Sequence, residues 1–179
     1  MQSNWEKSFD EVMRSEGGYV LTGIYGDLGG QTYAGIARNP NPNWEGWELV
    51  DKGVMPEIPM VKNFYKKIWN TVKGDDLPSG VDYLVYDFAV NAGAGQSAKF
   101  LQRAVGVPDD GGIGPITLAA VKGKDAKELI DAFTEQKEAF YNLIVKNRPE
   151  QSKFLLGWMN RVNHSKRIAL SMLGDNNGE

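Results

Sequence analysis

The chain has 179 residues, of which 41% are hydrophobic and 24% charged. This length fits one compact domain or two tightly joined lobes, and the composition supplies a hydrophobic core, so a large multidomain protein and a mainly disordered chain are excluded. The formal net charge of −3 argues against a nucleic-acid-binding protein, and a sequence with one histidine and no cysteine lacks the ligands for a zinc centre. We therefore expect no nucleic-acid partner, no metal and no cofactor.

The first predicted element is a helix that ends close to a carboxylate. Ser3 and Glu6 form a capping box at its start, and the glycine pair at 17–18 stops it. Apolar residues repeat at helical spacing along one face, at Trp5, Phe9 and Val12. At about 100° per residue, Glu16 falls in the middle of this face. An acidic side chain is therefore expected beside the core at the end of the helix.

Two irregular segments follow this helix. Seven glycines alternate with aromatic and β-branched residues between Gly17 and Gly35, a pattern that predicts short strands and tight turns in a small sheet. The segment 39–59 is rich in Pro, Asn, Gly and Trp and is predicted to be an irregular surface crossing.

The rest of the chain is predicted to be helical. Apolar residues recur at helical spacing over 61–72, 79–91, a short stretch around 100–104, a helix starting at Pro115, and two final runs over 129–143 and 154–162 that separate near Pro149. The fold class is therefore mainly α, with a small glycine-rich β-sheet near the N-terminus.

The final helices carry an excess of positive charge. Between Lys146 and Arg167 only Glu150 opposes the basic side chains, which are Lys146, Arg148, Lys153, Arg161, Lys166 and Arg167. This segment is suited to contact with an anionic surface, and a solvated helix face is the alternative interpretation.

The chain shows no targeting or membrane-spanning segment in its sequence. Its start lacks the basic and then apolar pattern of a secretory signal, and no apolar run is long enough to cross a bilayer. We expect a protein that is made in the cytoplasm.

The position of Glu16 suggests acid catalysis. Burial beside a core face and the negative end of the helix dipole both raise the pKa of a carboxyl group. A carboxyl group that stays protonated near neutral pH can protonate a glycosidic oxygen. A solvated residue of the last helical turn is the simpler alternative.

Hydrolysis of a sugar also needs a second polar group. Asp27 and Thr32 lie in the glycine-rich segment that is expected to fold back across the helix end. Asp27 could hold the attacking water or stabilise the oxocarbenium charge, and the Thr32 hydroxyl could position that water.

The motifs around these residues resemble glycoside hydrolase family 108, a family of lysozyme-like muramidases. The matching runs are 14–20 (RSEGGYV), 27–32 (DLGGQT) and 35–36 (GI). The resemblance implies that Glu16 is the catalytic glutamate and that Asp27 is the aspartate of the family's Asp-Pro-Gly-Gly segment. Leu28 replaces the usual proline, and Tyr33 replaces a common asparagine.

The second half of the chain resembles the predicted peptidoglycan-binding region that accompanies this family. The runs that carry this resemblance are 86–93 (YDFAVNAG), 100–104 (FLQRA), 110–115 (DGGIGP) and 157–158 (GW). We therefore expect a lysozyme-like catalytic lobe over 1–85 and a helical lobe over 86–175, packed as one compact unit.

A glycan cleft needs aromatic rings for the apolar faces of sugars and amides for their hydroxyl groups. Candidate substrate-binding residues are Tyr25, Tyr33, Trp44, Trp47, Tyr65, Trp69 and Asn91. The aromatic residues at helical spacing are equally consistent with core packing, and the role of Asn91 rests mainly on the resemblance.

The resemblance implies an N-acetylmuramidase that cleaves the β-1,4 bond between N-acetylmuramic acid and N-acetylglucosamine in peptidoglycan. We expect a monomeric phage endolysin, which reaches the cell wall from the host cytoplasm after the membrane has been permeabilised. Two other functions stay open at this point: that of a catalytically silent peptidoglycan-binding module and that of a lytic transglycosylase.

Overall fold

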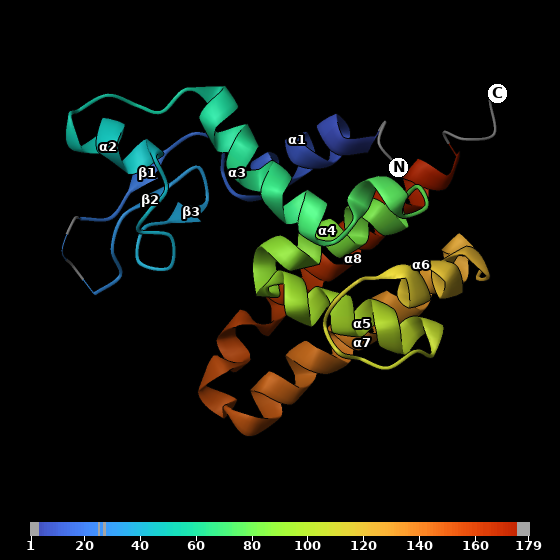
Figure 1. Cartoon of the computed structure of the whole chain (residues 1–179). Helices are drawn as coiled ribbons and strands as arrows, with labels where there is room; N and C mark the ends of the chain where they lie inside the picture. The colour runs from blue at the N-terminus through green and yellow to red at the C-terminus, as the bar shows by residue number, and fades with distance from the viewer. Residues whose placement is uncertain (1–3, 25, 27, 175–179) are drawn as a thin grey trace. The chain divides into compact units, whose positions relative to one another are not determined.

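The computed structural model describes residues 4–24, 26 and 28–174, and their main elements are helices (Figure 1). The helices are α1 (Trp5–Ser15), α2 (Gly46–Asp51), α3 (Ile58–Thr71), α4 (Val81–Ala92), α5 (Ala94–Val105), α6 (Pro115–Lys122), α7 (Ala126–Asn147) and α8 (Leu155–Gly174). Two 3-10 helices, η2 (Gly74–Asp76) and η3 (Pro149–Phe154), and three strands, β1 (Leu21–Thr22), β2 (Thr32–Tyr33) and β3 (Ile36–Ala37), complete these elements. The predicted class, mainly α with a small sheet near the N-terminus, is confirmed.

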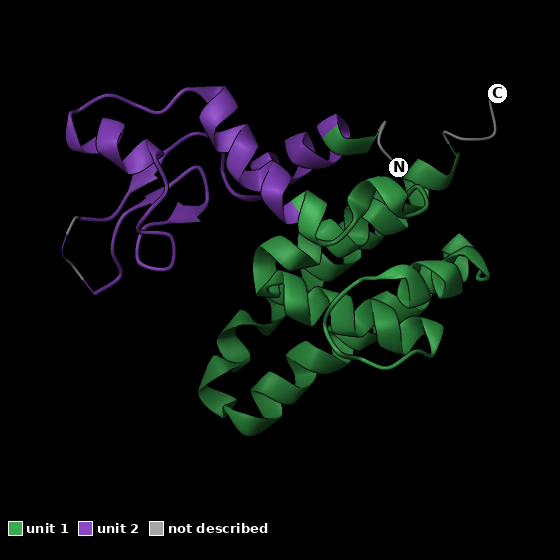
Figure 2. Cartoon of the chain, in the orientation of Figure 1, with its two compact units in different colours: residues 1–5, 69–179 green, residues 6–68 purple. Residues whose placement is uncertain are grey.

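The chain forms two compact units (Figure 2). Unit 2 comprises residues 6–68, and unit 1 comprises residues 1–5 and 69–179. This division differs from the expected lobes, 1–85 and 86–175. The reason is α4, in which residues 81–89 are all buried, because it packs against α5, α7 and α8 and so belongs with the C-terminal helices.

In unit 2, α1 ends in a Schellman motif. The Gly18 N–H donates to the Met13 carbonyl at 2.9 Å, and the Gly17 N–H donates to the Arg14 carbonyl at 3.3 Å. Gly17 has a φ of +84°, which a residue with a Cβ adopts only at a cost. The predicted stop at the glycine pair is confirmed, and Glu16 is the capping residue. The predicted capping box involves Ser3, which lies outside the described residues.

The sheet of unit 2 is antiparallel with strand order β1-β2-β3. Leu21 pairs with Tyr33, and Thr32 pairs with Ala37. A two-residue turn joins β2 to β3, with φ values of +51° at Ala34 and +80° at Gly35. Two positive φ values are typical of a type I′ turn, whose twist matches that of the paired strands. The prediction of short strands and tight turns is confirmed.

The segment predicted to be irregular, 39–59, contains α2. Its buried residues include Trp47 and Val50, so packing stabilises a helix that is too short to be stable by itself. The helix predicted over 61–72 begins slightly earlier, as α3.

Unit 1 contains the remaining predicted helices. The helix predicted over 79–91 is α4. The short helix predicted around 100–104 is part of α5, which begins earlier, and Pro115 occupies the first turn of α6. The two final runs are α7 and α8, and η3 separates them at Pro149. No described helix is long and apolar enough to cross a membrane.

A buried glutamine organises the loop between α5 and α6. Gln102 Nε2 lies 2.8 Å from Asp110 Oδ1, 3.0 Å from the Gly112 carbonyl oxygen and 3.2 Å from Thr117 Oγ1, so its two N–H groups are shared among three acceptors. Its Oε1 accepts from the Gly111 N–H at 2.9 Å. One side chain therefore connects the turn of the sequence motif 110–115 to the first turn of α6.

The Gln102→Leu substitution should destabilise this part of unit 1. Leucine keeps most of the volume but leaves several polar groups without partners, so we expect the free energy of unfolding to fall by roughly 2–4 kcal/mol. Urea unfolding followed by circular dichroism measures this change. A loss below about 1 kcal/mol would mean that water replaces the glutamine in these bonds.

A second buried polar group lies between α4, α7 and α8. The Lys137 ammonium donates to Ser165 Oγ at 2.9 Å and lies 4.0 Å from Asp87 Oδ2. Arg161 lies 3.6 Å from the other oxygen of Asp87. Burial lowers the pKa of Lys137 from 10.5 to about 8; the Asp87 carboxylate opposes this shift, and Arg161 adds to it.

The stability of the protein should therefore rise with pH above about 8. Between the pKa of folded Lys137 and its ordinary value, the unfolded chain binds more protons than the folded chain, so the free energy of unfolding increases by up to about 1.4 kcal/mol per pH unit. Below this window both states are protonated and the contribution is constant. Urea unfolding of the wild type and Lys137→Met across this window tests it, because only the wild type should show the rise.

Candidate active site

Glu16 lies at the C-terminal end of α1, directly after Ser15. Its N–H donates to the Val12 carbonyl at 2.9 Å, so the helical hydrogen-bond pattern continues to this residue. Val12 is buried, whereas Glu16 is half-buried. The carboxyl group therefore leaves the helix beside the core and retains access to solvent, which is the placement that a proton donor needs.

The turn of the β2-β3 hairpin packs against Glu16. A Cβ built at Gly35 would lie 2.9 Å from Cγ and 3.0 Å from Cβ of Glu16, and 2.5 Å from the Tyr65 hydroxyl oxygen. These distances leave no room for a side chain at position 35. The hairpin, α1 and α3 thus meet at Glu16, and Gly35 makes this close approach possible.

Tyr65 holds the turn in place from α3. Its hydroxyl group donates to the Ala34 carbonyl at 2.7 Å in a buried hydrogen bond. The Ala34 N–H donates to the Val20 carbonyl at 3.2 Å, which connects the same turn to the segment after Glu16. The position of the turn relative to the end of α1 is therefore determined by hydrogen bonds from two sides.

Thr32 lies on β2 of this hairpin and is half-buried. Since successive side chains of a strand point to opposite faces, it points away from the buried side that Tyr33 occupies. The Thr32 hydroxyl remains a candidate for positioning water. The predicted second carboxylate, Asp27, and the predicted sugar contact Tyr25 lie outside the described residues.

Unit 2 has two surface hollows near the glycine-rich segment. One is lined by Asp10, Met13, Arg14, Gly17, Gly18 and Tyr19, and it adjoins the capped end of α1. The other is polar and is lined by Gly26, Gly30, Gln31, Arg38, Asn39 and Pro42. Both are formed by the glycine-rich segment and its neighbours, so this part of unit 2 offers the concave surfaces that a glycan strand needs.

Arg38 is fixed at the polar hollow. Its guanidinium donates to Gln31 Oε1 at 2.8 Å and to both carboxylate oxygens of Asp51 at 2.8 Å. The hydrogen bond from Arg38 is the main cause that lowers the pKa of Asp51. The guanidinium also lies 5.1 Å from the centre of the Trp47 ring. Sequence reasoning did not identify Arg38 as a site candidate.

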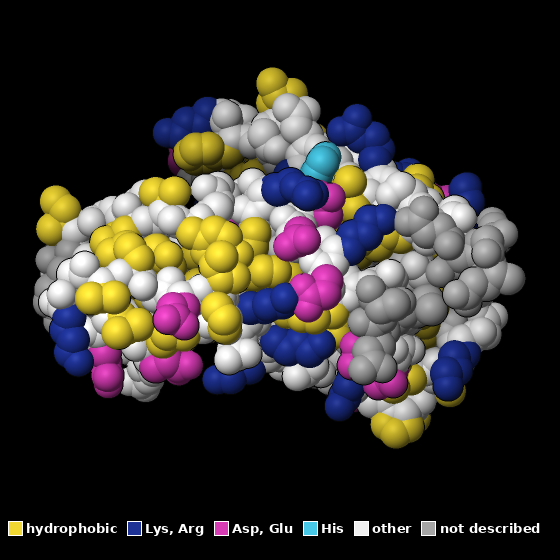
Figure 3. Space-filling model, turned by 90° about the horizontal axis from the view of Figure 1, so that it is seen from above, with side chains coloured by type: hydrophobic (Ala, Val, Ile, Leu, Met, Phe, Trp, Pro, Cys, Tyr) yellow, Lys and Arg dark blue, Asp and Glu magenta, His cyan; other side chains and the backbone are white. Residues whose placement is uncertain are grey.

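Exposed apolar residues also gather on unit 2. Figure 3 shows hydrophobic side chains grouped over the left part of the view, which unit 2 forms. Val54 and Met55, between α2 and α3, and Ile58, the first residue of α3, are exposed. Apolar surface is thus available outside the core, although none of these three residues was predicted to contact substrate.

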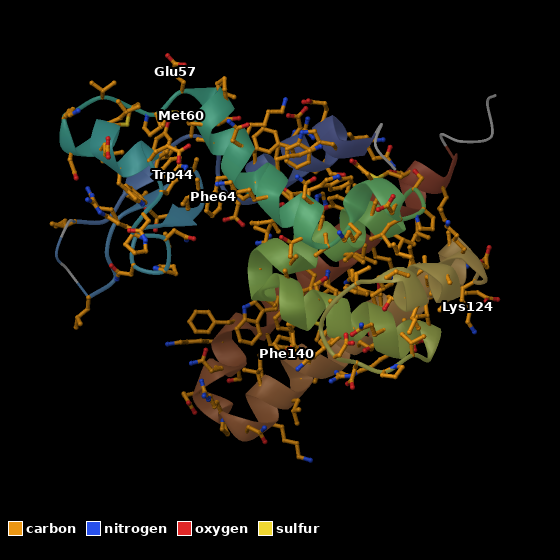
Figure 4. The ribbon with its side chains drawn as sticks, in the orientation of Figure 1. Trp44, Glu57, Met60, Phe64, Lys124 and Phe140 are labelled. Atoms are coloured by element: carbon orange, nitrogen blue, oxygen red, sulfur yellow. The ribbon has the colours of Figure 1, made fainter. Side chains whose placement is uncertain are left out.

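Five predicted sugar-binding aromatics are core residues instead, with exposed fractions from 0% to 8%: Tyr33, Trp44, Trp47, Tyr65 and Trp69. Rings this buried do not offer a face to a sugar. Trp44 lies between Tyr33 and Phe64, with ring centres 6.3 Å from each, and Figure 4 labels Trp44 and Phe64 in unit 2. Trp69 donates to Asp75 Oδ1 at 2.9 Å in unit 1. The structure therefore assigns these rings to packing.

Asn91 differs from these aromatics because its side chain is exposed, in the last turn of α4. It belongs to unit 1, whereas Glu16 belongs to unit 2. Its contact with substrate stays a prediction.

The groups missed by sequence reasoning are Gly35, the carbonyl group of Ala34 and Arg38. The turn at 34–35 has a local signal, because a glycine follows an alanine between two strand-forming pairs. The contact of Gly35 with Glu16 has no local sequence signal, since it depends on how the hairpin packs. In the described part of the chain, no three acidic or histidine side chains are grouped to hold a metal ion.

Two protein families match the chain. The family described as Glycosyl hydrolase 108 matches residues 9–93, and the family described as Predicted Peptidoglycan domain matches residues 96–163. Among curated proteins no relative matches. The solved structure of SagA from Brucella abortus is 33% identical and superimposes with a TM-score of 0.79, covering 96% of this chain and 97% of SagA.

The first family match contains α1 from Phe9 onward, Glu16 and the sheet, and the second contains the loop that Gln102 organises. The likeness to SagA extends over nearly the whole of both chains. The chain therefore belongs to the glycosyl hydrolase 108 family, as a glycoside hydrolase that acts on peptidoglycan.

Proposed function

We propose that the protein is an N-acetylmuramidase, which hydrolyses the β-1,4 bond between N-acetylmuramic acid and N-acetylglucosamine with Glu16 as the general acid. The observation that carries the proposal is the close approach of Gly35 to Glu16. It holds a half-buried carboxyl group between a helix end and a hairpin, next in the chain to Gly17 and Gly18, which line a surface hollow. A solvated last-turn residue would not need a neighbour without a side chain.

In this mechanism the Glu16 carboxyl group donates its proton to the glycosidic oxygen while the bond to the anomeric carbon of N-acetylmuramic acid breaks. The oxocarbenium ion that forms takes up water, and the proton of this water passes to a carboxylate, either that of Asp27 or that of Glu16, which is ionised after it has donated its own proton. We assign the positioning of this water to Thr32 and Asp27, which precedes Thr32 in the glycine-rich segment. The departing N-acetylglucosamine leaves with a free 4-hydroxyl group.

Mass spectrometry of wall fragments after borohydride reduction tests the bond and the reaction. A muramidase adds one water per cleavage and exposes N-acetylmuramic acid as the reducible end. Fragments that end in reduced N-acetylglucosamine would reject the bond assignment. Anhydro fragments without added water would identify a lytic transglycosylase, and wall binding without new ends would identify a silent binding module.

We also propose a role as a phage endolysin, made in the bacterial cytoplasm and acting on the wall as a monomer. Support for this role comes only from the sequence, namely from the family resemblance and from a start that lacks the pattern of a secretory signal. Cells that express the protein should stay intact until their inner membrane is permeabilised and should then lyse. Lysis that does not need permeabilisation, or equal lysis with the Glu16→Gln variant, would contradict this role.

A further inference from the structure

The turn between α7 and α8 exposes an unusual set of apolar side chains. We call residues 142–160 the hairpin tip; in Figure 1 they form the orange end of α7 and the start of α8, which extends beyond the other helices of unit 1. Within the tip, Leu143 is 54% exposed, Phe154 45% and Leu156 74%. Single exposed apolar residues are common on protein surfaces, but three in and beside the connection between α7 and α8 indicate an interaction site.

Positive charge accompanies these apolar residues. Lys146, Arg148 and Lys153 are exposed, and Glu150 is the acidic residue among them. Among the described residues, none of the three cations forms an ion pair. Further along α8, Arg161 lies 3.6 Å from Asp87 and Lys166 lies 3.4 Å from Asp131, whereas Arg167 is exposed and forms no ion pair with a described residue. Three of the four unpaired cations of the basic segment therefore lie at the tip.

Stacked aromatic rings support the tip. The ring centres of Tyr141 and Trp158 are 5.2 Å apart at an interplanar angle of 27°, and those of Phe154 and Trp158 are 5.9 Å apart at 31°. Lys153 lies over the outer ring, with its ammonium 5.1 Å from the centre of Phe154. The stack fixes Phe154 at the surface and places a cation beside it.

We propose that the hairpin tip binds the surface of a bilayer that contains anionic phospholipid. Exposed Leu and Phe side chains insert at the boundary between headgroups and acyl chains, aromatic rings lie at headgroup level, and Lys and Arg contact the phosphate groups. The tip carries all three. A polyanionic wall polymer would account for the cations, but it offers nothing to Leu143 and Leu156, so the aliphatic exposure favours lipid.

Vesicle sedimentation of the full chain tests this proposal. The protein should sediment with vesicles of phosphatidylcholine and phosphatidylglycerol in equal amounts, remain in solution with phosphatidylcholine alone, and detach as salt rises. Lys146→Gln together with Lys153→Gln should weaken binding by roughly tenfold or more. The matched control is Lys122→Gln with Lys124→Gln, which removes two exposed lysines of the same unit (Figure 4 labels Lys124) and should leave binding unchanged.

Tryptophan quenching by brominated lipid locates the contact. Of the five tryptophans, four are buried, and Trp158 is half-buried at the tip. Quenching should therefore be seen in the wild type and lost in Trp158→Phe. Leu156→Ser should reduce both quenching and sedimentation.

Three results would overturn the proposal. They are equal binding to neutral vesicles, equal loss of binding in the control variant, and binding to soluble polyphosphate without lipid quenching. A dimer in analytical ultracentrifugation that Leu156→Ser dissociates would assign the tip to a second copy of the chain instead. Glu16→Gln should bind vesicles as the wild type does, so this proposal and the proposed function can fail separately.

Discussion

The Glu16→Gln variant should lose wall hydrolysis while it keeps its fold. Glutamine has nearly the same shape as glutamate but cannot donate a carboxyl proton, and general acid catalysis contributes about 10²–10⁴-fold to a reaction rate. Release of reducing ends from purified peptidoglycan should fall by a factor in this range. Wall binding should change little, because the peptidoglycan domain match lies in other residues, 96–163.

The matched control for this variant is Glu57→Gln. Glu57 is an exposed glutamate of the same unit, just before α3 (Figure 4). Glu57→Gln makes the same chemical substitution away from Glu16 and should keep wild-type activity. Circular dichroism and the midpoint of thermal unfolding must be equal in both variants and the wild type. If folded Glu16→Gln retains more than about a tenth of the activity, Glu16 does not donate the proton.

The Gly35→Ala variant should also lose most of its activity. Its new Cβ would meet Glu16 at 2.9 Å and the Tyr65 hydroxyl oxygen at 2.5 Å, so the hairpin, Glu16 or both must move. A displacement of about 1 Å of a catalytic group can cost up to about 100-fold in rate. We expect the loss to appear in kcat more than in KM, because the change displaces the proton donor.

Backbone strain alone would also destabilise this variant, because Gly35 has a φ of +80°. Gly53→Ala separates the two effects. Gly53 has a φ of +76°, but a Cβ there would meet nothing within 4 Å. Both variants should lose about 1–2 kcal/mol of stability from the left-handed backbone, and only Gly35→Ala should lose activity. Equal activity of the two variants would show that the contact with Glu16 has no catalytic role.

The aromatic residues show how far sequence reasoning could go. Trp44 and Trp47 are predicted to bind sugar because they lie in a segment whose sequence predicts an irregular structure. In the structure Trp47 anchors α2, and its ring supports Arg38. Sequence identifies a large ring and its neighbours along the chain, but burial depends on the elements that pack over it. The same argument applies to Tyr65, whose hydroxyl group binds the turn carbonyl of Ala34.

The sequence by itself determined the features that depend on neighbouring residues. Helical periodicity placed most helices, and the glycine pair 17–18 determined where α1 ends, because the Schellman bonds join residues at most five positions apart. That local stop fixes Glu16 as the capping residue beside the apolar face. The family motifs belong to the same class of information, since they are short runs of consecutive residues.

The tertiary structure alone decided which groups surround Glu16. Gly35 approaches it from a hairpin, and Tyr65 of α3 holds the same turn through the Ala34 carbonyl; no periodicity or local hydrogen bond indicates this meeting. It also decided that α4 belongs with the C-terminal helices and that five aromatic rings are core. The physical reason is that burial and steric contact are properties of packed surfaces, whereas helix formation and capping are satisfied within a few residues of chain.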